Sequence, residues 1–225
     1  DDTALATSSF GQGYNVTMIQ QIAAFCSVIN GGYYYQPRVV SEITDSNGSV
    51  VEKIDAKLLK QVISSEVSDK LREYLGIAVE EGTGQSAKVE GYTMGGKTGT
   101  AEKVDPETGT RNKTDYLVSF IGFAPLDDPQ VAIYVVVDRP HTDNQANSVY
   151  AQELAKNIMT EVLPYLGLYP DDGTENTGDA SETGAQNDNL PTPEDAEEDE
   201  SVQNGGNDRY SDGMTNEDTE LSDGT

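Results

Sequence analysis

The residues best suited to chemistry in this 225-residue chain lie in one stretch, Lys97-Thr98-Gly99-Thr100. A lysine places a positive charge near an anion or a hydroxyl, and a threonine hydroxyl can hydrogen-bond a carboxylate. Gly99 has no side chain, so a substrate can lie against the backbone there and pair with it. In a strand, Lys97 and Gly99 would share one face and Thr98 would point to the other. We therefore interpret the stretch as the rim of a substrate site, to which Gly95 and Gly96 keep the approach open.

The same stretch also matches the P-loop pattern, with four residues between Gly91 and Gly96-Lys97-Thr98. A P-loop needs a buried strand before the loop and a helix after it, whose N-terminal amides face the phosphates. Here the preceding residues are polar and include glycines, and the following ones show no apolar helical stripe and soon reach Pro106. Nucleotide binding is the less favoured interpretation, but the pattern alone leaves it open.

Other reactive side chains are few. The single cysteine excludes an internal disulfide, and the single histidine disfavours a Ser-His-Asp triad or a histidine-based zinc site. Cys26 falls on an apolar helical stripe, where packing explains it better than reactivity, and we place His141 in a surface loop without a role. Asp105, Glu107 and Asp115 lack the spacing of a calcium loop. We expect no metal and no cofactor.

Apolar periodicity predicts helices over residues 17–30, 66–81 and 146–166. Thr17 and Gln20 fit a capping box at the start of the first helix, and Ser65 fits the N-cap of the second. Asn30-Gly31-Gly32 would end the first helix by allowing positive φ. The inner faces are expected to carry one apolar residue about every four positions: Val67, Leu71, Leu75 and Val79 in the second helix, and Val149, Leu154, Ile158, Val162 and Leu166 in the last.

Strands are predicted over residues 39–43, 50–54, 92–102, 115–124 and 131–138. The sequence between the first two of these strands, Asp45-Ser46-Asn47-Gly48, is typical of a β-hairpin turn. Tyr33-Tyr34-Tyr35 would pack in a strand or form a partner surface. Residues 131–138 are almost continuously apolar, which is typical of a buried central strand. Successive strands with short connections indicate an antiparallel sheet with helices packed on it, so we expect an α+β fold.

Charge divides the chain at about residue 170. The net charge is −26, and residues 171–225 carry 18 acidic residues against one basic residue, Arg209. That segment has too few apolar residues to offset the entropy of ordering it, so residues 170–225 are expected to form a disordered acidic tail behind one domain of residues 1–169. The charge also argues against a nucleic-acid binder with a basic face, and no run reaches the roughly 18 apolar residues of a membrane span.

Five segments then occur in an order typical of one family. They are Phe10-Gly11-Gln12-Gly13, Asn30-Gly31-Gly32, Glu80-Glu81-Gly82-Thr83-Gly84, Gly96-Lys97-Thr98-Gly99-Thr100-Ala101-Glu102 and Phe120-Ile121-Gly122-Phe123-Ala124-Pro125. With these segments, residues 5–169 resemble the C-terminal part of a class B penicillin-binding protein transpeptidase domain. The K-T-G tripeptide is one of three motifs of that superfamily. The resemblance implies a β-lactamase/transpeptidase-like fold, present here as a partial domain.

The resemblance also implies a serine acyltransferase that acts on peptidoglycan stem peptides ending in D-Ala-D-Ala, and whose serine β-lactams acylate. Lys97 would shape the electrostatics around the serine hydroxyls, Thr98 and Thr100 would bind the terminal carboxylate beside Gly99, and the backbone N–H of Thr100 would supply half of the oxyanion hole. The location would be the outer face of the cell membrane, with an anchor upstream and with other cell-wall synthesis proteins as partners.

The chain departs from the family pattern in one respect. No serine is followed by lysine three positions later or by asparagine two positions later: Ser68 opens S-D-K-L and Ser86 opens S-A-K-V. We expect the nucleophile and its lysine upstream of Asp1, and this chain alone to be inactive. A D,D-carboxypeptidase or β-lactam sensor of the same superfamily, a non-catalytic wall-binding module and an NTP-binding protein remain as alternatives.

Overall fold

A computed structural model describes residues 2–170 except residues 10, 12 and 106. The expected acidic tail, residues 171–225, therefore lies outside the described residues, as do Phe10 and Gln12 of the first family segment.

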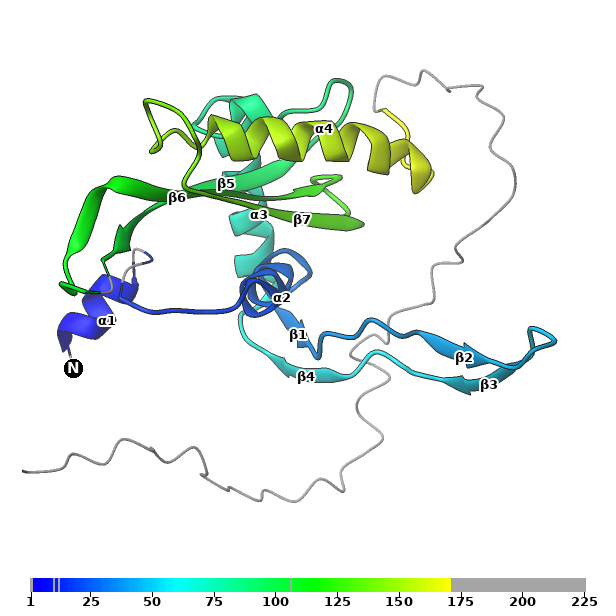
Figure 1. Ribbon diagram of the computed structural model, residues 1–225. Helices are drawn as coiled ribbons and strands as arrows, with labels where there is room; N and C mark the ends of the chain where they lie inside the picture. The colour runs from blue at the N-terminus through cyan, green and yellow to red at the C-terminus, as the bar shows by residue number, and fades with distance from the viewer. Residues whose placement is uncertain (1, 10, 12, 106, 171–225) are drawn as a thin grey trace, which may run out of the picture. The chain divides into compact units, whose positions relative to one another are not determined.

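The described part of the chain is built on a three-stranded antiparallel sheet (Figure 1). Its strands are β5 (Gly95–Val104), β6 (Arg111–Ala124) and β7 (Val131–Asp138), in the order β5-β6-β7. This confirms the α+β prediction. The central position predicted for β7 is wrong, because among the described residues β7 pairs only with β6 and forms an edge.

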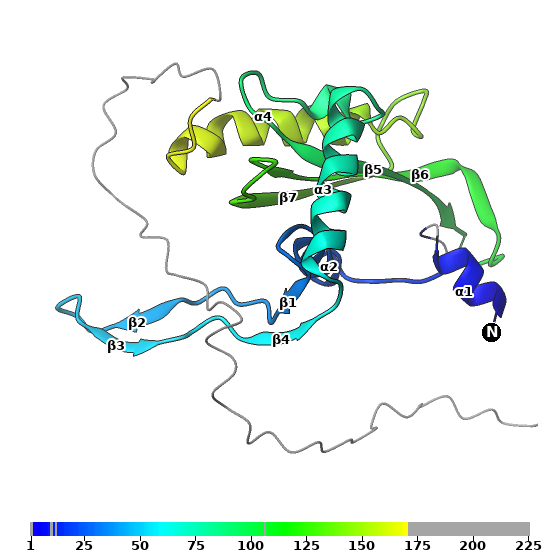
Figure 2. The same ribbon diagram turned by 180° about the vertical axis from the view of Figure 1, so that it is seen from behind.

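Helices cover both faces of this sheet. Figure 1 shows α4 (Val149–Tyr165) on one side and α2 (Met18–Ile29) on the other. In Figure 2, the view from the opposite side, α3 (Ser65–Glu80) crosses in front of the strands. We call the side that presents Val118 and Phe120 the α4 face, and the side that presents Ile121 and Phe123 the α2 face. A short helix, α1 (Asp2–Ser8), and a 3-10 turn, η1 (Gln85–Ala87), were not predicted.

Two narrow ribbons connect α2 to α3. The strand β1 (Tyr33–Tyr35) pairs with β4 (Leu58–Gln61), and β2 (Glu42–Thr44) pairs with β3 (Val50–Lys53). The predicted hairpin is confirmed, since the Asp45 carboxylate accepts the backbone N–H groups of Asn47 and Ser49 at 2.8 and 2.9 Å. The strand β4 was not predicted, because Leu-Leu-Lys-Gln has no alternating pattern. Its pairing partner, β1, is distant in sequence.

The helix ends mostly follow the predicted chemistry. The capping box is present, because the amide of Gln20 donates to Thr17 Oγ1 at 3.3 Å and the amide of Thr17 donates to Gln20 Oε1 at 2.9 Å. The N-cap of α3 is Ser64 and not Ser65, since Ser64 Oγ accepts from the Val67 amide at 3.3 Å. Ser65 instead donates its hydroxyl to the Gly31 carbonyl.

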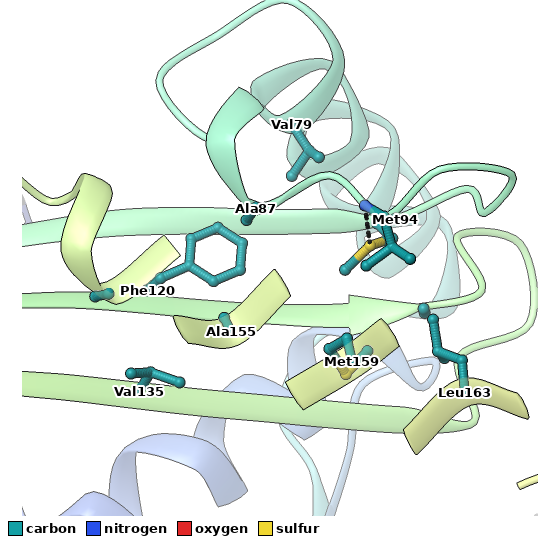
Figure 3. Close-up of a cluster of buried hydrophobic side chains, with 11 residues drawn as sticks. Val79, Ala87, Met94, Phe120, Val135, Ala155, Met159 and Leu163 are labelled. Atoms are coloured by element: carbon teal, nitrogen blue, oxygen red, sulfur yellow. Dashed lines mark hydrogen bonds between the residues drawn. The ribbon is translucent and has the colours of Figure 1, made fainter. Parts of the chain in front are cut away.

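The main core lies between α4, η1 and the sheet (Figure 3). Its buried members are Val79, Ala87, Val89, Met94, Phe120, Ala124, Val135, Ala151, Ala155, Met159 and Leu163. The predicted inner face of α4 is wrong, because Leu154, Ile158 and Leu166 are 45%, 40% and 45% exposed. The buried face is shifted by about one residue, and the small Ala151 and Ala155 let the helix lie close to the sheet.

A second cluster on the α2 face contains Phe25, Ile29, Ile121 and Phe123. The rings of Phe25 and Phe123 meet with centroids 6.0 Å apart in a tilted arrangement. Leu75 of α3 packs against this cluster, while Val79, one turn later, reaches the main core. The first residue of the predicted stripe, Val67, is 46% exposed and does not belong to either core. The helix α3 therefore joins the two cores near β5.

Candidate functional site

The candidate site lies along the outer strand of the sheet. Lys97, Thr98, Gly99 and Thr100 occupy the first half of β5, whose second edge has no partner strand among the described residues. The register places Lys97 opposite Ile121 and Thr98 opposite Phe120 on β6. Lys97 is therefore on the α2 face and Thr98 on the α4 face, as the alternation of a strand predicts. A ligand at this edge can reach side chains from both faces.

The same register rules out the P-loop interpretation. Gly96, Lys97 and Thr98 are consecutive strand residues, and the strand continues to Val104. No helix begins at Thr98, so its amides cannot form the phosphate cradle that the pattern requires. The match to the pattern is coincidental.

The polar groups along this edge have specific partners. The Lys97 side chain is exposed, and its ammonium donates to the Thr98 carbonyl at 3.0 Å. The Thr98 hydroxyl is half-buried and lies 3.1 Å from the hydroxyl of Thr83. The Thr100 hydroxyl donates to the Ala146 carbonyl at 3.4 Å, in the loop before α4. Two loops distant in sequence thus contact the threonines of the strand.

The glycines of the stretch serve packing more than access. Gly95 and Gly96 are buried, and a Cβ on either would collide with the rings of Phe123 and Phe120. The expectation that these two glycines keep the approach open is therefore wrong. They leave room for two phenylalanine rings against the strand. Gly99 is half-buried, and a Cβ there would stand 2.6 Å from Ser119 Oγ.

Thr83 is the contact that sequence reasoning missed. The sequence shows it only within the family segment Glu80–Gly84, whereas in the structure its hydroxyl contacts that of Thr98 in the candidate site. Its position between Gly82 and Gly84 was a signal, because a polar residue held between two glycines is typical of a tight, specific loop. The sequence alone could not indicate that this loop would meet β5.

Cys26 lies away from this set of contacts, in a pocket of about 230 Å³ on α2 and β1 that Tyr33 and Tyr35 also line. Burial disfavours the charged thiolate and raises the pKa of Cys26 above its ordinary value. This agrees with a packing role for the residue. The tyrosines are half-buried in β1, which confirms the strand expected for them.

The remaining polar candidates are separated by the fold. Asp105 Oδ1 accepts the amides of Glu107 and Thr108 at 2.8 and 3.3 Å within its own turn, whereas Asp115 accepts from Arg139 Nε at 3.1 Å. His141 is exposed in the loop after β7. Within residues 2–170, excluding the three undescribed positions, no group of three His, Cys, Asp or Glu side chains is placed to hold a metal ion.

Comparison with known proteins identifies relatives of this arrangement. The family model described as the penicillin-binding protein transpeptidase domain matches residues 3–160. Stage V sporulation protein D of Bacillus subtilis is 46% identical over 166 residues, which cover 73% of this chain and 25% of that protein. The penicillin-binding protein PbpB of Mycolicibacterium smegmatis is 35% identical over 137 residues, which cover 58% of this chain and 21% of that protein.

Solved structures agree with these sequence matches. Penicillin-binding protein 3 of Mycobacterium tuberculosis, complexed with aztreonam, superimposes with a TM-score of 0.65 at 28% identity, covering 75% of this chain and 39% of the other. The transpeptidase domain of Burkholderia pseudomallei penicillin-binding protein 3 gives a TM-score of 0.63 at 26% identity. The match covers 76% of this chain and 49% of the other.

The chain spans only about a quarter of the length of the curated relatives named above. Within the described residues, no helix is long and apolar enough to cross a membrane.

Proposed function

The chain belongs to the penicillin-binding protein transpeptidase family, and from this premise we propose that it forms the carboxylate-binding edge of a peptidoglycan D,D-transpeptidase. The nucleophilic serine and its lysine are proposed to lie outside this chain, since none of its serines has the S-x-x-K spacing.

The proposed reaction is acyl transfer in two steps. The serine oxygen attacks the carbonyl carbon of the penultimate D-alanine, and the peptide bond to the terminal D-alanine breaks. The terminal D-alanine leaves as an amine that has taken up a proton. An amine of a neighbouring stem peptide then attacks the ester, forms the cross-linking amide and returns the serine hydroxyl. A β-lactam would acylate the same serine.

Each residue of the edge has one proposed role. The charge of Lys97 stabilises anionic groups near the serine, and Thr98 and Thr100 bind the terminal carboxylate through their hydroxyls. The backbone N–H of Thr100 donates to the oxyanion that forms on the attacked carbonyl. Gly99 lets the stem peptide approach and pair with the free edge of β5.

The observation that carries this proposal is the position of Lys97-Thr98-Gly99 on an exposed edge strand. Lysine and threonine side chains leave that strand on opposite faces, and its backbone has no partner strand among the described residues on the outer side. Support comes also from relatives named as probable peptidoglycan D,D-transpeptidases and from the β-lactam complexes of the solved relative. The proposed location is the outer face of the cell membrane, where peptidoglycan and other cell-wall synthesis proteins would be the partners.

The test uses fluorescent penicillin and mass spectrometry. The chain of residues 1–225 should form no covalent adduct, whereas the full-length protein that contains it should form one adduct at a serine outside this chain. In the full-length protein, Lys97→Ala should reduce the acylation rate at least about tenfold, because loss of a hydrogen-bonded charge costs about 1.5–3 kcal/mol. Lys103→Ala, which removes the ion pair of Lys103 with Asp138, is the matched control.

A stable adduct on any serine of residues 1–225 would overturn the proposal. So would a full-length protein that penicillin does not acylate, or a Lys97→Ala variant that is acylated at the normal rate.

A further inference from the structure

A tight loop after α3 brings one hydroxyl to the candidate carboxylate site. The amide of Gly84 donates to the Ala78 carbonyl at 2.8 Å, which folds the loop back on the end of the helix. A Cβ on Gly82 or Gly84 would lie 2.8 or 2.9 Å from that same carbonyl oxygen, so neither position has room for a side chain. The loop therefore has little freedom to move Thr83.

Two further contacts hold the residues after the loop against Glu80, at the end of α3. Lys88 Nζ meets Glu80 Oε2 at 2.6 Å, and Gln85 Nε2 donates to the Glu80 carbonyl at 3.1 Å. These bonds join the residues before and after Thr83. An exposed ion pair contributes little stability by itself. Here the ion pair and the Gln85 bond add to the bond between the Gly84 amide and the Ala78 carbonyl, and together they fix where the Thr83 hydroxyl lies.

The hydroxyl of Thr83 is 3.1 Å from that of Thr98, and either oxygen can be the donor. A hydroxyl carries one hydrogen and two lone pairs. If Thr98 donates to Thr83, Thr98 has no hydrogen left for a carboxylate. If Thr83 donates to Thr98, the hydrogen of Thr98 is free to donate outward. A carboxylate at Thr98 accepts only, so it selects the second arrangement.

In that arrangement the two hydroxyls form a chain from Thr83 through Thr98 to the carboxylate. Accepting a bond makes the Thr98 hydroxyl a stronger donor, since hydrogen bonds in series polarise one another. The contact also restricts rotation of the Thr98 side chain before the ligand arrives, which lowers the entropy cost of binding.

We propose that Thr83 is a positioning residue that orients the Thr98 hydroxyl toward the terminal carboxylate of the substrate. This inference rests on the proposed function, because it assumes that Thr98 binds that carboxylate. It assigns to the loop after α3 a part in recognising the D-alanyl terminus, although Thr83 itself does not touch the substrate.

The experiment compares benzylpenicillin with its methyl ester as acylating agents of the full-length protein. Thr83→Val removes the hydroxyl and keeps the shape. It should slow acylation by benzylpenicillin about three- to tenfold, the loss expected for one hydrogen bond, and should leave the rate with the ester almost unchanged. Thr83→Ser should restore the rate. Thr160→Val on α4, whose hydroxyl bonds the Lys156 carbonyl, is a control that should affect neither compound.

Thr98→Val separates this inference from the proposed function. It should give the same selective loss, and the double variant Thr83→Val/Thr98→Val should lose no more than Thr98→Val alone, because Thr83 acts through Thr98. Equal slowing with both compounds, no slowing in Thr83→Val, or additive losses would overturn the role of Thr83 while leaving the proposed function in place. A Thr98→Val variant without selective loss would overturn the carboxylate role of Thr98, and the inference with it.

Discussion

Gly99 is the glycine of the candidate site whose missing side chain leaves room for a hydroxyl. Ser119 on β6 lies opposite it, with its hydroxyl in the space that a Cβ of residue 99 would need. Side chains of paired residues stand on the same face, so the Ser119 hydroxyl would have to rotate away from a new Cβ, whereas the Ser119 Cβ would stand at an ordinary 3.9 Å. The glycine thus lets the Ser119 hydroxyl keep its present position beside the edge where the substrate is proposed to lie.

Gly99→Ala should therefore destabilise the protein by only about 1 kcal/mol, the cost of moving the Ser119 hydroxyl out of its present rotamer. Urea unfolding followed by circular dichroism measures this. In the double variant Gly99→Ala/Ser119→Ala the hydroxyl is gone and no glycine is added to β6, so most of the stability should return. If the single and double variants unfold at the same urea concentration, the contact with Ser119 is not the cause.

Cys26 gives a prediction on pH. Burial raises the pKa of its thiol, so less of the reactive thiolate is present at a given pH. Alkylation by iodoacetamide in the folded chain should be slower than in a cysteine peptide, and its rate should rise to half-maximum at a higher pH. The same chain unfolded in urea is the control. Equal pH profiles for folded and unfolded chains would contradict the prediction.

At the scale of elements, side chains of α3 supply hydrogen-bond partners for the backbone at the C-terminal end of α2. The Ser68 hydroxyl donates to the Val28 carbonyl at 2.6 Å and accepts the Gly31 amide at 3.0 Å, and Arg72 Nη1 donates to the Ile29 carbonyl at 3.2 Å. The last carbonyls of a helix lack partners within the helix. A second helix supplies them here, which fixes α2 against α3 beneath the sheet.

Ser68→Ala should cost about 1–3 kcal/mol of stability, because it leaves buried polar groups without partners. Ser68 is fully buried, which excludes water as an easy replacement. Thermal unfolding by calorimetry checks this, with the exposed Ser41→Ala as the matched control. An unchanged melting temperature for Ser68→Ala would show that the bond between the helices contributes nothing.

At the scale of the whole molecule, the composition of β7 does not suit its place at an edge. Both faces of the strand are apolar: Val135 packs in the main core and Tyr134 against the cluster on the α2 face. Apolar edge strands are uncommon because they invite pairing with further strands. We therefore expect another strand to pair along β7 in the full-length protein.

Hydrogen exchange can detect that strand. In residues 1–225 alone, the β7 amides that point away from β6 should exchange much faster than those bonded to β6. In the full-length protein the same amides should be protected. Equal exchange of the outward amides in the two proteins would contradict the prediction. The β6 amides, paired on both sides, serve as the internal control.

The acidic C-terminal segment gives the last prediction, which rests on composition alone. Residues 171–225 carry 18 acidic residues and few apolar ones, so they have little surface to bury against the rest of the chain. Truncation after Tyr169 should leave the melting temperature unchanged within about 2 °C. A cooperative loss of folding on truncation would show that the segment contributes to the core.

Several features were predictable because they depend on neighbours in sequence. The capping box of Thr17 and Gln20, the hairpin at Asp45, and the antiparallel order of β5, β6 and β7 follow from short-range chemistry and short connections. The alternation of side chains along β5 was also predictable, because a strand repeats every two residues whatever surrounds it. With the family segments, this was enough to propose a candidate site at Lys97.

Other features arise only when distant parts of the chain meet. The P-loop pattern was refuted by the pairing of β5 with β6, and Gly95 and Gly96 were explained by phenylalanine rings of another strand. The residues of α4 that are buried were revealed only by the packing of this helix in the main core. The contact of Thr83 with Thr98 joins a loop and a strand that no local pattern connects. Local propensity specifies how a segment folds, whereas packing determines which of its side chains touch.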